Sequence, residues 1–396
     1  MNETPLQASR ATLQMFLIFS AVSLLLAAIA VVFPYEYRDS DSLAYQHIAR
    51  RLASRPTAEW IRPEWWGHGG NTGLFRDHPP GIFLLPASLI RLGVPGRSAP
   101  LVANFLYMLL LLLALHGLVK TLAGNSAAWG SVFAFVLTPI FLQYLMRANH
   151  ELPLALAVVA GLYGLARCEE SLRWSALYGA AMLLAVFTKG VSGLALSLSS
   201  AALWAVAFRT RRVLWVIAAG HLLALAAVLG FEALYRSAAG EGFLRFYFGF
   251  QGGKAVEAGF HPVKKLYNIV WYLARILWFA APWVLFLVYY ALRSLRKRSD
   301  LLRGRFLRLA LAASAAVVLF FSLFDRKADR YIFPAYVLLA AAGAAVLDAR
   351  RPAWKRFFDK NPVRLAWILG TLLVVLTLLR VYFHTYHYRF IRFWAQ

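Results

Sequence analysis

Two shortages in the sequence exclude whole classes of protein. A single cysteine, Cys168, among 396 residues allows no intrachain disulfide bond and no thiolate metal cluster. Acidic residues are few, since 18 Asp and Glu face 42 Lys and Arg, and the formal net charge is +24. Phosphate-binding glycine loops, dinucleotide fingerprints, HExxH zinc motifs and GxSxG elbows are absent from the sequence. Nucleotide-driven transport and zinc-dependent hydrolysis therefore have no support in the sequence.

Apolar residues, by contrast, dominate the chain. Hydrophobic residues make up 61% of it, including 29 Phe, 18 Tyr and 13 Trp, and the mean hydropathy is +0.59. A soluble domain carries about 45–50% apolar residues, so the chain is predicted to be a polytopic membrane protein. The positive charges lie in short connections between apolar runs, which favours anionic lipid and a phosphate-bearing substrate over nucleic acid as partners. The first run, Leu13–Phe33, has no small-residue cleavage site after it and is predicted to be a retained span.

Hydropathy predicts an all-α integral membrane protein, with a bundle of about 11 transmembrane helices in a single domain over residues 1–396. The predicted spans are 13–34, 99–119, 126–146, 151–167, 174–188, 190–208, 213–235, 266–291, 307–324, 331–348 and 364–383. Pro80–Leu92 is too short to span and is predicted to be broken by Pro86, which indicates an interfacial or re-entrant segment. With the N-terminus inside, this topology puts three basic clusters in the cytoplasm: Arg209–Arg212, Arg293–Arg308 and Arg350–Arg356.

Two outward loops are long enough to build a site under this topology. The first, 35–98, is expected to carry interfacial helices and the catalytic acids, and the second large outward loop is 236–265. No soluble domain is expected at the C-terminal end. Ionisable side chains also gather on the outward side against the positive-inside tendency, which is a site hypothesis in a membrane protein. They are Arg50, Arg51, Arg147, Lys189, Lys254, Lys264, Lys265, Arg326, Lys327 and Arg330, with Asp39, Asp41, Asp77, Glu151, Glu257, Asp325 and Asp329.

Asp39 and Asp41 follow the first span closely. A carboxylate at the lip of a membrane span costs about 2–4 kcal/mol if it is desolvated, so two of them there suggest a function. One of these residues, or Ser42, can simply cap the helix that follows, but a cap needs only one residue. At least one of the two aspartates is therefore predicted to deprotonate a sugar or lipid hydroxyl. The sequence leaves open which of the two it is.

Three further residues lie at span ends, and each also has a plainer structural explanation. His78 is held extended by the following prolines, although the Pro-Pro pair also suits the start of a helix. Glu151 can belong to a site or simply favour the positive end of the helix that it begins. Lys189 can contact a phosphate or extend its ammonium group to the membrane surface.

A short charged loop precedes the predicted span at 331–348. Residues 324–330 carry three cations and two acids, and the span begins with Tyr331 and, three residues later, Pro334. Ordinary solvation of a loop is one explanation. So many charges in so short a connection favour a functional role for Lys327 and Arg330.

Taken in order, these motifs resemble the GT-C superfamily of polyprenyl-phosphate-sugar-dependent glycosyltransferases over roughly residues 10–345. The nearest branch is the group of protein O-mannosyltransferases and lipid A aminoarabinose transferases. Asp41, Tyr45 and Ile48-Ala49-Arg50 look like its Asp-Glu-x-x-Tyr-x-x-Ile-Ala-Arg motif, and His78-Pro79-Pro80 looks like its Lys-Pro-Pro. Arg147 and Glu151 look like the Arg and Asp of its second outward loop, and Thr188-Lys189-Gly190 matches its Thr-Lys-Gly. The segment from Phe321 to Pro334 looks like its Phe-Ser-x-x-x-Lys-x-x-x-Tyr-x-x-Pro.

The resemblance implies a GT-C-like fold and an in-line displacement at the anomeric carbon of a lipid-linked sugar. It implies that Asp41, with or without Asp39, deprotonates the acceptor and that Glu151 positions this centre. The residues expected to bind the donor and its phosphate are His78, Lys189, Lys327, Arg330, Tyr331, Tyr45 and Lys254. The implied partners are a polyprenyl-phosphate sugar, membrane lipids and a glycolipid, polysaccharide or protein acceptor, at the outer face of a bacterial-type inner membrane. No cofactor is implied, and a divalent metal is left open.

The chain departs from the family pattern at several positions. Ser42 replaces the second acid, His78 replaces the lysine, Glu151 replaces the aspartate, and Gln251 and Lys254 stand where related enzymes tend to have His and Arg. The sugar and the acceptor therefore stay open.

An alternative of another class is a lipid or ion transporter that uses the outward carboxylates. That alternative predicts acids buried in mid-span or paired broken helices in two halves of the chain. A non-catalytic membrane scaffold is a third possibility, and it leaves the outward charges unexplained.

Overall fold

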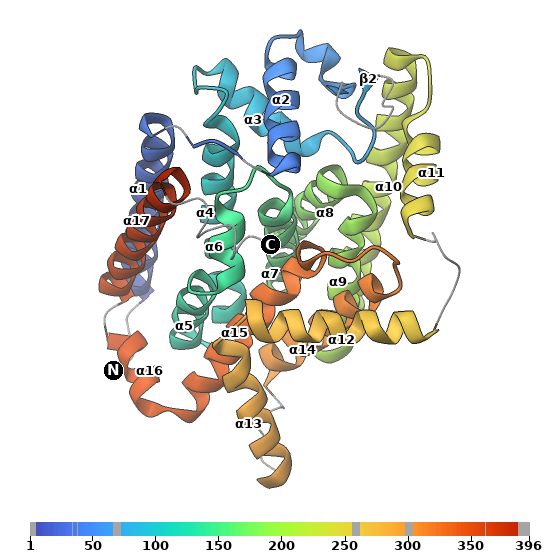
Figure 1. Cartoon of the computed structure of the whole chain (residues 1–396). Helices are drawn as coiled ribbons and strands as arrows, with labels where there is room; N and C mark the ends of the chain where they lie inside the picture. The colour runs from blue at the N-terminus through green and yellow to red at the C-terminus, as the bar shows by residue number, and fades with distance from the viewer. Residues whose placement is uncertain are drawn as a thin grey trace.

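The computed structural model describes residues 5–33, 35–37, 39–65, 73–255, 262–297, 304–360 and 362–386. These residues form a helical bundle (Figure 1), because long apolar segments in lipid must satisfy their backbone hydrogen bonds internally. The elements are α1 (Pro5–Val32), α2 (Ser40–Ala53), η1 (Thr57–Ile61), β1 (Glu64–Trp65), β2 (Gly73–Leu74), α3 (Gly81–Arg91), α4 (Ala99–Ala123), α5 (Asn125–Val136), α6 (Pro139–Leu145), α7 (Glu151–Cys168), η2 (Leu172–Trp174), α8 (Ser175–Lys189), η3 (Gly190–Gly193), α9 (Leu194–Val206), α10 (Arg211–Ala239), α11 (Phe243–Ala255), α12 (Pro262–Phe279), α13 (Trp283–Lys297), α14 (Arg305–Ser322), η5 (Asp329–Ile332), α15 (Phe333–Arg350), α16 (Pro352–Lys360) and α17 (Pro362–Tyr386).

Seven helices of the described residues are long and apolar enough to cross a membrane, and two bent pairs raise that number to nine. The predicted all-α membrane bundle is therefore confirmed, while the count of eleven spans stays a prediction. The segment predicted as one span over 266–291 consists of α12 and α13, which meet at an angle of 111°. The segment at 126–146 is likewise bent by 63° between α5 and α6. Pro282 and Pro139 lie at these bends, where the missing amide hydrogen interrupts the helical hydrogen bonding.

The chain reverses direction between α8 and α9. Tyr178 of α8 packs against Gly220 of α10, while Ser197 of α9 hydrogen-bonds to His221, the next residue of α10. Tyr178 and Ser197 therefore lie at the same height along α10, although 19 residues separate them in the sequence. The turn between them centres on Gly190, whose φ of 57° and ψ of −118° suit glycine and strain other residues.

The first predicted outward loop, 35–98, contains α2, α3 and a small antiparallel hairpin, which pairs Glu64 with Leu74 and Trp65 with Gly73. These elements cover one end of the bundle, at the top of Figure 1. The prediction that Pro86 breaks the segment at 80–92 is wrong, because α3 continues through it. A proline within a helix removes one backbone hydrogen bond and need not end it. Most of the second predicted loop, 236–265, is also helical, since α11 fills its middle, and residues 256–261 lie outside the described part.

Burial divides the helices into a centre and a rim. The span windows of α7 and of η5–α15 are 89% and 83% buried, whereas that of α10 is 22% buried. Small residues let α15 lie in the centre, because a Cβ on Gly343 would be 2.2 Å from the backbone oxygen of Trp283. At the rim, the first helix, α1, packs lengthwise against the last described helix, α17 (Figure 1).

Candidate active site

The two aspartates at the start of α2 have different roles. Asp39 is the N-cap, and its Oδ1 accepts a hydrogen bond of 3.0 Å from the backbone N–H of Ser42. The Ser42 hydroxyl in turn accepts a 3.0 Å hydrogen bond from the backbone N–H of Ala148, which ties α2 to the segment before α7. Asp41 lies in the first turn of α2 and pairs with Arg330 of η5. The capping explanation therefore applies to Asp39 and leaves Asp41 for the site.

A buried charged pair lies beneath α2. Glu151 is 1% exposed, and its Oε1 lies 4.0 Å from the ammonium nitrogen of Lys189. That nitrogen also lies 4.9 Å from the centroid of the Tyr331 ring, a cation–π distance. Among the described residues, neither Glu151 Oε2 nor the Lys189 ammonium has a hydrogen-bond partner, and Glu151 Oε1 has only His150 Nε2 within 3.2 Å. Buried groups with this much unused hydrogen-bonding capacity are typical of a ligand site.

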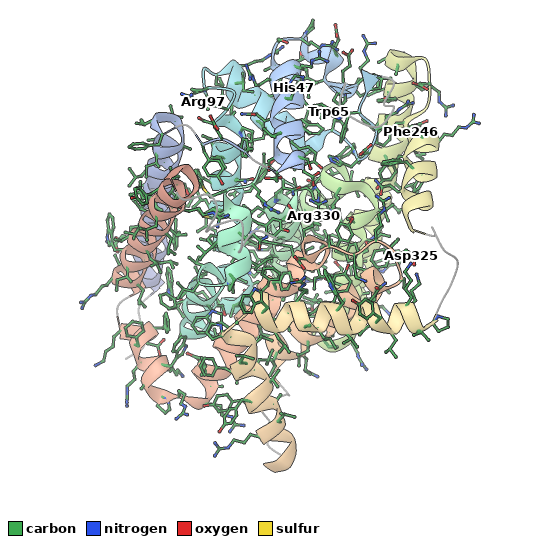
Figure 2. The ribbon with its side chains drawn as sticks, in the orientation of Figure 1. His47, Trp65, Arg97, Phe246, Asp325 and Arg330 are labelled. Carbon is green, nitrogen blue, oxygen red and sulfur yellow. The ribbon has the colours of Figure 1, made fainter. Side chains whose placement is uncertain are left out.

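Four charged side chains thus converge from four separate segments. Asp41 comes from α2, Glu151 from α7, Lys189 from α8 and Arg330 from η5. In the view of Figure 2, the label of Arg330 lies between α2 and α12. The four positions are separated by up to 289 residues in sequence, and the fold alone brings them together.

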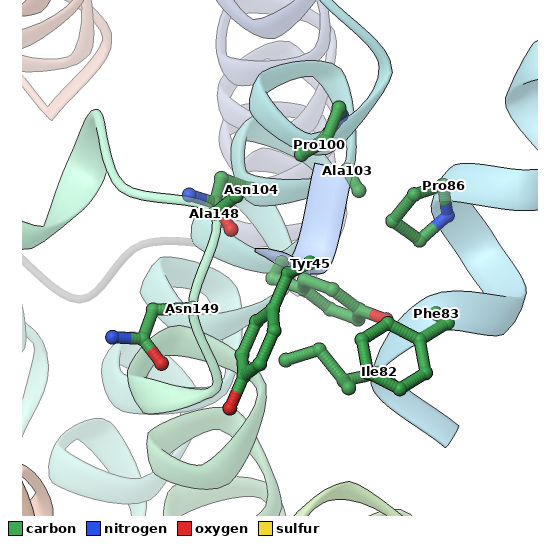
Figure 3. A pocket seen from close by; sticks show the side chains of 10 residues that line it. Tyr45, Ile82, Phe83, Pro86, Pro100, Ala103, Asn104, Ala148 and Asn149 are labelled. Atoms are coloured by element: carbon green, nitrogen blue, oxygen red, sulfur yellow. The ribbon is translucent and has the colours of Figure 1, made fainter. Parts of the chain in front are cut away.

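Tyr45 connects two histidines at the edge of this cluster. Its hydroxyl lies 2.7 Å from His78 Nε2 and 3.4 Å from His150 Nδ1, and His150 Nε2 lies 3.2 Å from Glu151 Oε1. In Figure 3 the Tyr45 ring stands between α3 and the segment that carries Asn149. Burial, and to a lesser degree the charge of Asp41, raises the pKa of the phenol well above its usual value.

His150 is neutral at pH 7 in this environment. Burial lowers the pKa of its imidazole to about 4, and the opposing effect of the neighbouring Glu151 carboxylate does not reverse that shift. The uncharged ring can donate only one hydrogen bond, either to Tyr45 or toward Glu151. His150 therefore adds polar contacts to the cluster without adding positive charge.

An apolar cavity of about 300 Å³ lies beside the turn at Gly190, the residue that follows Lys189. Its walls come from α8, η3, α9, α10 and α11, and Pro79 and Gly190, the neighbours of His78 and Lys189, belong to the lining. Most of the lining is aliphatic or aromatic. The exceptions include Ser197 and His221, which bond to each other at 2.8 Å. The lining includes Gly190 but not the Lys189 side chain itself.

The structure does not bring every predicted site residue into this cluster. Lys327 faces α12, where its ammonium donates a 3.2 Å hydrogen bond to Asn268 Oδ1 and lies 4.2 Å from the Tyr267 ring centroid. Partial burial, with the charge of Lys264, lowers the pKa of Lys327. Lys254 lies in the last turn of α11, and its side chain is outside the described residues.

His150 is the residue that the sequence motifs did not single out. It lies between Arg147 and Glu151, which belong to a motif, and its own spacing is that of an ordinary residue at the start of a helix. Asn149, also buried, accepts a 2.9 Å hydrogen bond from the His150 N–H and lines a small pocket with Tyr45. Within the described residues no group of three or more His, Cys, Asp and Glu has metal-binding geometry.

Replacing Gly190 with alanine is expected to disturb the turn that presents Lys189. A Cβ there would lie 2.2 Å from the Tyr247 hydroxyl, which accepts a 2.7 Å hydrogen bond from the Val191 N–H and donates to the Lys189 carbonyl. The backbone conformation adds strain of about 1–3 kcal/mol. We expect a lower melting temperature in detergent, measured against Gly249→Ala, where a Cβ would meet open space. An equal effect of the two substitutions would contradict this assignment of the turn.

Comparisons with known proteins agree with the motifs. Residues 77–235 match the family model described as dolichyl-phosphate-mannose-protein mannosyltransferase, and no curated protein sequence matches the chain.

Two solved structures share the fold. ArnT from Cupriavidus metallidurans, bound to undecaprenyl phosphate, matches with a TM-score of 0.67 and 19% identity over 84% of this chain and 60% of ArnT. The oligosaccharyltransferase AglB from Archaeoglobus fulgidus, with an inhibitory peptide and a dolichol-phosphate, matches with a TM-score of 0.52 and 14% identity over 94% of this chain and 55% of AglB. The chain thus spans less than two thirds of either relative. The chain therefore shares the fold of two membrane proteins with bound lipid phosphates, and its residues 77–235 match a glycosyltransferase family model.

Proposed function

We propose that the protein transfers a sugar from a polyprenyl-phosphate-sugar donor to an acceptor hydroxyl or phosphate on a glycolipid, polysaccharide or protein. The observation that carries this proposal is the buried Lys189–Glu151 pair near an apolar cavity, in which the Lys189 ammonium has no hydrogen-bond partner among the described residues. An amphiphile with one phosphate and a hydrocarbon tail fits such a cation-and-cavity arrangement. The undecaprenyl phosphate and dolichol-phosphate bound to the two structural relatives support the same class of ligand.

The charged cluster has the groups that the reaction needs. In the proposed step, an acceptor oxygen attacks the anomeric carbon, its proton passes to the Asp41 carboxylate, and the anomeric C–O bond to the phosphate breaks. The electron pair stays on the departing phosphate, where Lys189 and Arg330 stabilise the growing negative charge. Glu151 positions Lys189, with which it pairs at 4.0 Å. Asp39, as the N-cap, holds the turn of α2 that presents Asp41.

The other predicted donor-binding residues surround this centre at different distances. Tyr45 holds His78 on the cavity side, where Pro79 joins the lining, and Tyr331 places its ring against Lys189. Lys327 and Lys254 are proposed to meet the donor or acceptor farther out, near α12 and α11 respectively.

We propose an outward-facing site in a bacterial-type inner membrane. Glu151 begins α7, and the basic segment 209–212 lies at the other end of that helix, where Arg212 donates a 2.8 Å hydrogen bond to the Glu169 carbonyl. At about 1.5 Å per residue, the two ends are about 25 Å apart, close to the thickness of a bilayer core. Basic residues favour the cytoplasmic side, so the site is expected on the opposite one. A carboxylate at a helix end also suits catalysis better than transport through mid-span acids.

The direct test is binding and turnover of polyprenyl-monophosphate sugars by the purified protein. We expect the wild type to bind such donors and to hydrolyse or transfer the sugar, and Lys189→Ala to bind them poorly. Arg293→Ala, which alters a cation on α13 away from the cluster, serves as the charge-matched control. Absence of binding for every lipid phosphosugar would show that the likeness is one of fold only.

Filling the apolar cavity should distinguish long donors from short ones. Val228 of α10 lines the cavity, so Val228→Trp should obstruct a long prenyl chain and raise its KM at least about tenfold, equivalent to about 1.4 kcal/mol of lost apolar contact. A donor with a prenyl chain too short to reach Val228 should keep its KM. Leu229→Trp is the matched control, since Leu229 is 56% exposed on the outer face of the same helix. Equal effects on both donors would place the lipid tail elsewhere.

A further inference from the structure

Asp41 and Arg330 have separate tasks in the proposed reaction, yet the structure pairs them with each other. The Arg330 guanidinium donates a hydrogen bond to Asp41 Oδ2. While it does so, part of the Asp41 carboxylate is occupied and the charge of Arg330 is neutralised. Asp41 cannot be a fully available base, nor Arg330 a fully available phosphate ligand, in this arrangement.

Asp41 is the acid that depends on Arg330. Asp39 and Asp329 have other arginines, since Asp39 Oδ2 lies 4.0 Å from Arg147 Nε and Asp329 Oδ1 lies 3.2 Å from Arg275 Nε. The Asp41 and Arg330 side chains remain 37% and 28% exposed, so a ligand can reach both. Arg330 Nε, in addition, has no hydrogen-bond partner among the described residues.

The charge balance of the cluster also bears on the Asp41–Arg330 pair. When Lys189 and Arg330 are protonated and Glu151 and Asp41 are ionised, the two positive and two negative charges of the cluster cancel. A phosphodiester brings one more negative charge. It can bind strongly only if a cation turns from its acid toward the phosphate, and Arg330 is the more exposed of the two cations.

We propose that the donor phosphate and Asp41 compete for Arg330, so that binding of the donor releases Asp41 to accept the acceptor's proton. The inference rests on the proposed function, because it takes a lipid phosphate as the ligand of this cluster. Without a donor, Arg330 acts as a positioning residue that holds Asp41. With a donor, the same guanidinium forms hydrogen bonds to phosphate oxygens, and both Asp41 oxygens become available to the acceptor. The donor therefore binds before the acceptor can be deprotonated.

The competition makes an unusual prediction about binding. Asp41→Asn removes the base but also frees Arg330, so this inactive variant should bind a polyprenyl monophosphate more tightly than the wild type does. We expect a Kd about 3- to 30-fold lower, which lies within the range of coupling between groups in direct contact. The probe is undecaprenyl monophosphate, titrated into purified wild type, Asp41→Asn, Arg330→Gln and the double variant, with Asp39→Asn as the control for loss of a nearby negative charge.

The double variant decides between competition and simple removal of charge. If Arg330 mediates the effect, Asp41→Asn should tighten binding in the wild-type background and leave the Kd of Arg330→Gln unchanged. An equal gain in both backgrounds, a similar gain in Asp39→Asn, or no gain at all would overturn the inference while lipid-phosphate binding by the wild type still supports the proposed function. If the wild type binds no lipid phosphate, the proposed function fails and the inference fails with it. If Arg330→Gln does not fold, Arg330→Lys takes its place. In that background the gain in affinity from Asp41→Asn should fall below about threefold, because lysine lacks the forked geometry of the guanidinium. An undiminished gain would overturn the inference.

Discussion

Replacing Asp41 with asparagine is expected to lower kcat for sugar transfer by about 10²- to 10⁴-fold, the contribution of a general base. Asparagine has nearly the same shape, and the substituted residue lies in the first turn of α2 at a partly exposed position, so the fold should persist. The measurement is steady-state turnover of a lipid phosphosugar, together with a melting curve in detergent. A rate within tenfold of the wild type would show that another group accepts the proton.

Asp39→Asn is the matched control for this experiment. Asparagine caps helices about as well as aspartate, so the free energy of unfolding should change by less than about 0.5 kcal/mol. Turnover should stay within a few-fold of the wild type, since Asp39 Oδ1 is engaged by the Ser42 N–H. A large loss in Asp39→Asn, with a normal rate in Asp41→Asn, would exchange the two assignments.

The second large effect concerns the Lys189–Glu151 pair. Lys189→Met leaves the Glu151 carboxylate, 1% exposed, without its closest cation, and breaking a buried pair in this way costs about 3–5 kcal/mol of stability. We expect a lower melting temperature and weak binding of lipid phosphosugars. The double variant Lys189→Met/Glu151→Gln removes both charges and should recover most of the stability but not the binding.

Melting temperature and donor binding together show whether the Lys189–Glu151 pair has a structural or a functional role. If the double variant regains both stability and donor binding, the pair only holds the helices together and the phosphate is bound elsewhere. If Lys189→Met is as stable as the wild type, the two charges are not coupled at the 4.0 Å separation seen here. Thermal melting and lipid titration on the same preparations give both answers.

Much of the site could be predicted because its residues lie at recognisable positions in the sequence. Asp41, Glu151 and Lys189 each adjoin an apolar run, and an ionisable residue at a span end stands out against its neighbours. The charged loop at 324–330 indicated Arg330, and the family-like motif that follows it indicated Tyr331. What the sequence could not provide was the division of labour between Asp39 and Asp41, because one residue of spacing does not determine which carboxylate turns back to cap the helix.

Other features depended on packing that leaves no local pattern. His150 joins Tyr45 to Glu151 only because α2 and α7 meet, through contacts such as the one between Ser42 and Ala148. Lys327 has the motif spacing of a donor ligand, yet the aromatic and amide side chains of α12 hold its ammonium. The bend between α12 and α13 could not be predicted either, because a hydropathy window averages over the residues at which the helix changes direction.

The pairing of α1 with α17 has a consequence for biosynthesis. α17 follows α1 by about 330 residues, so at about 5–20 residues per second it is synthesised some tens of seconds after its lengthwise neighbour. Until then α1, which leads directly into the loop that carries Asp39 and Asp41, lacks the neighbour that packs along it in the folded protein. The α1–α17 contact can thus form only after the helices between the two have been synthesised.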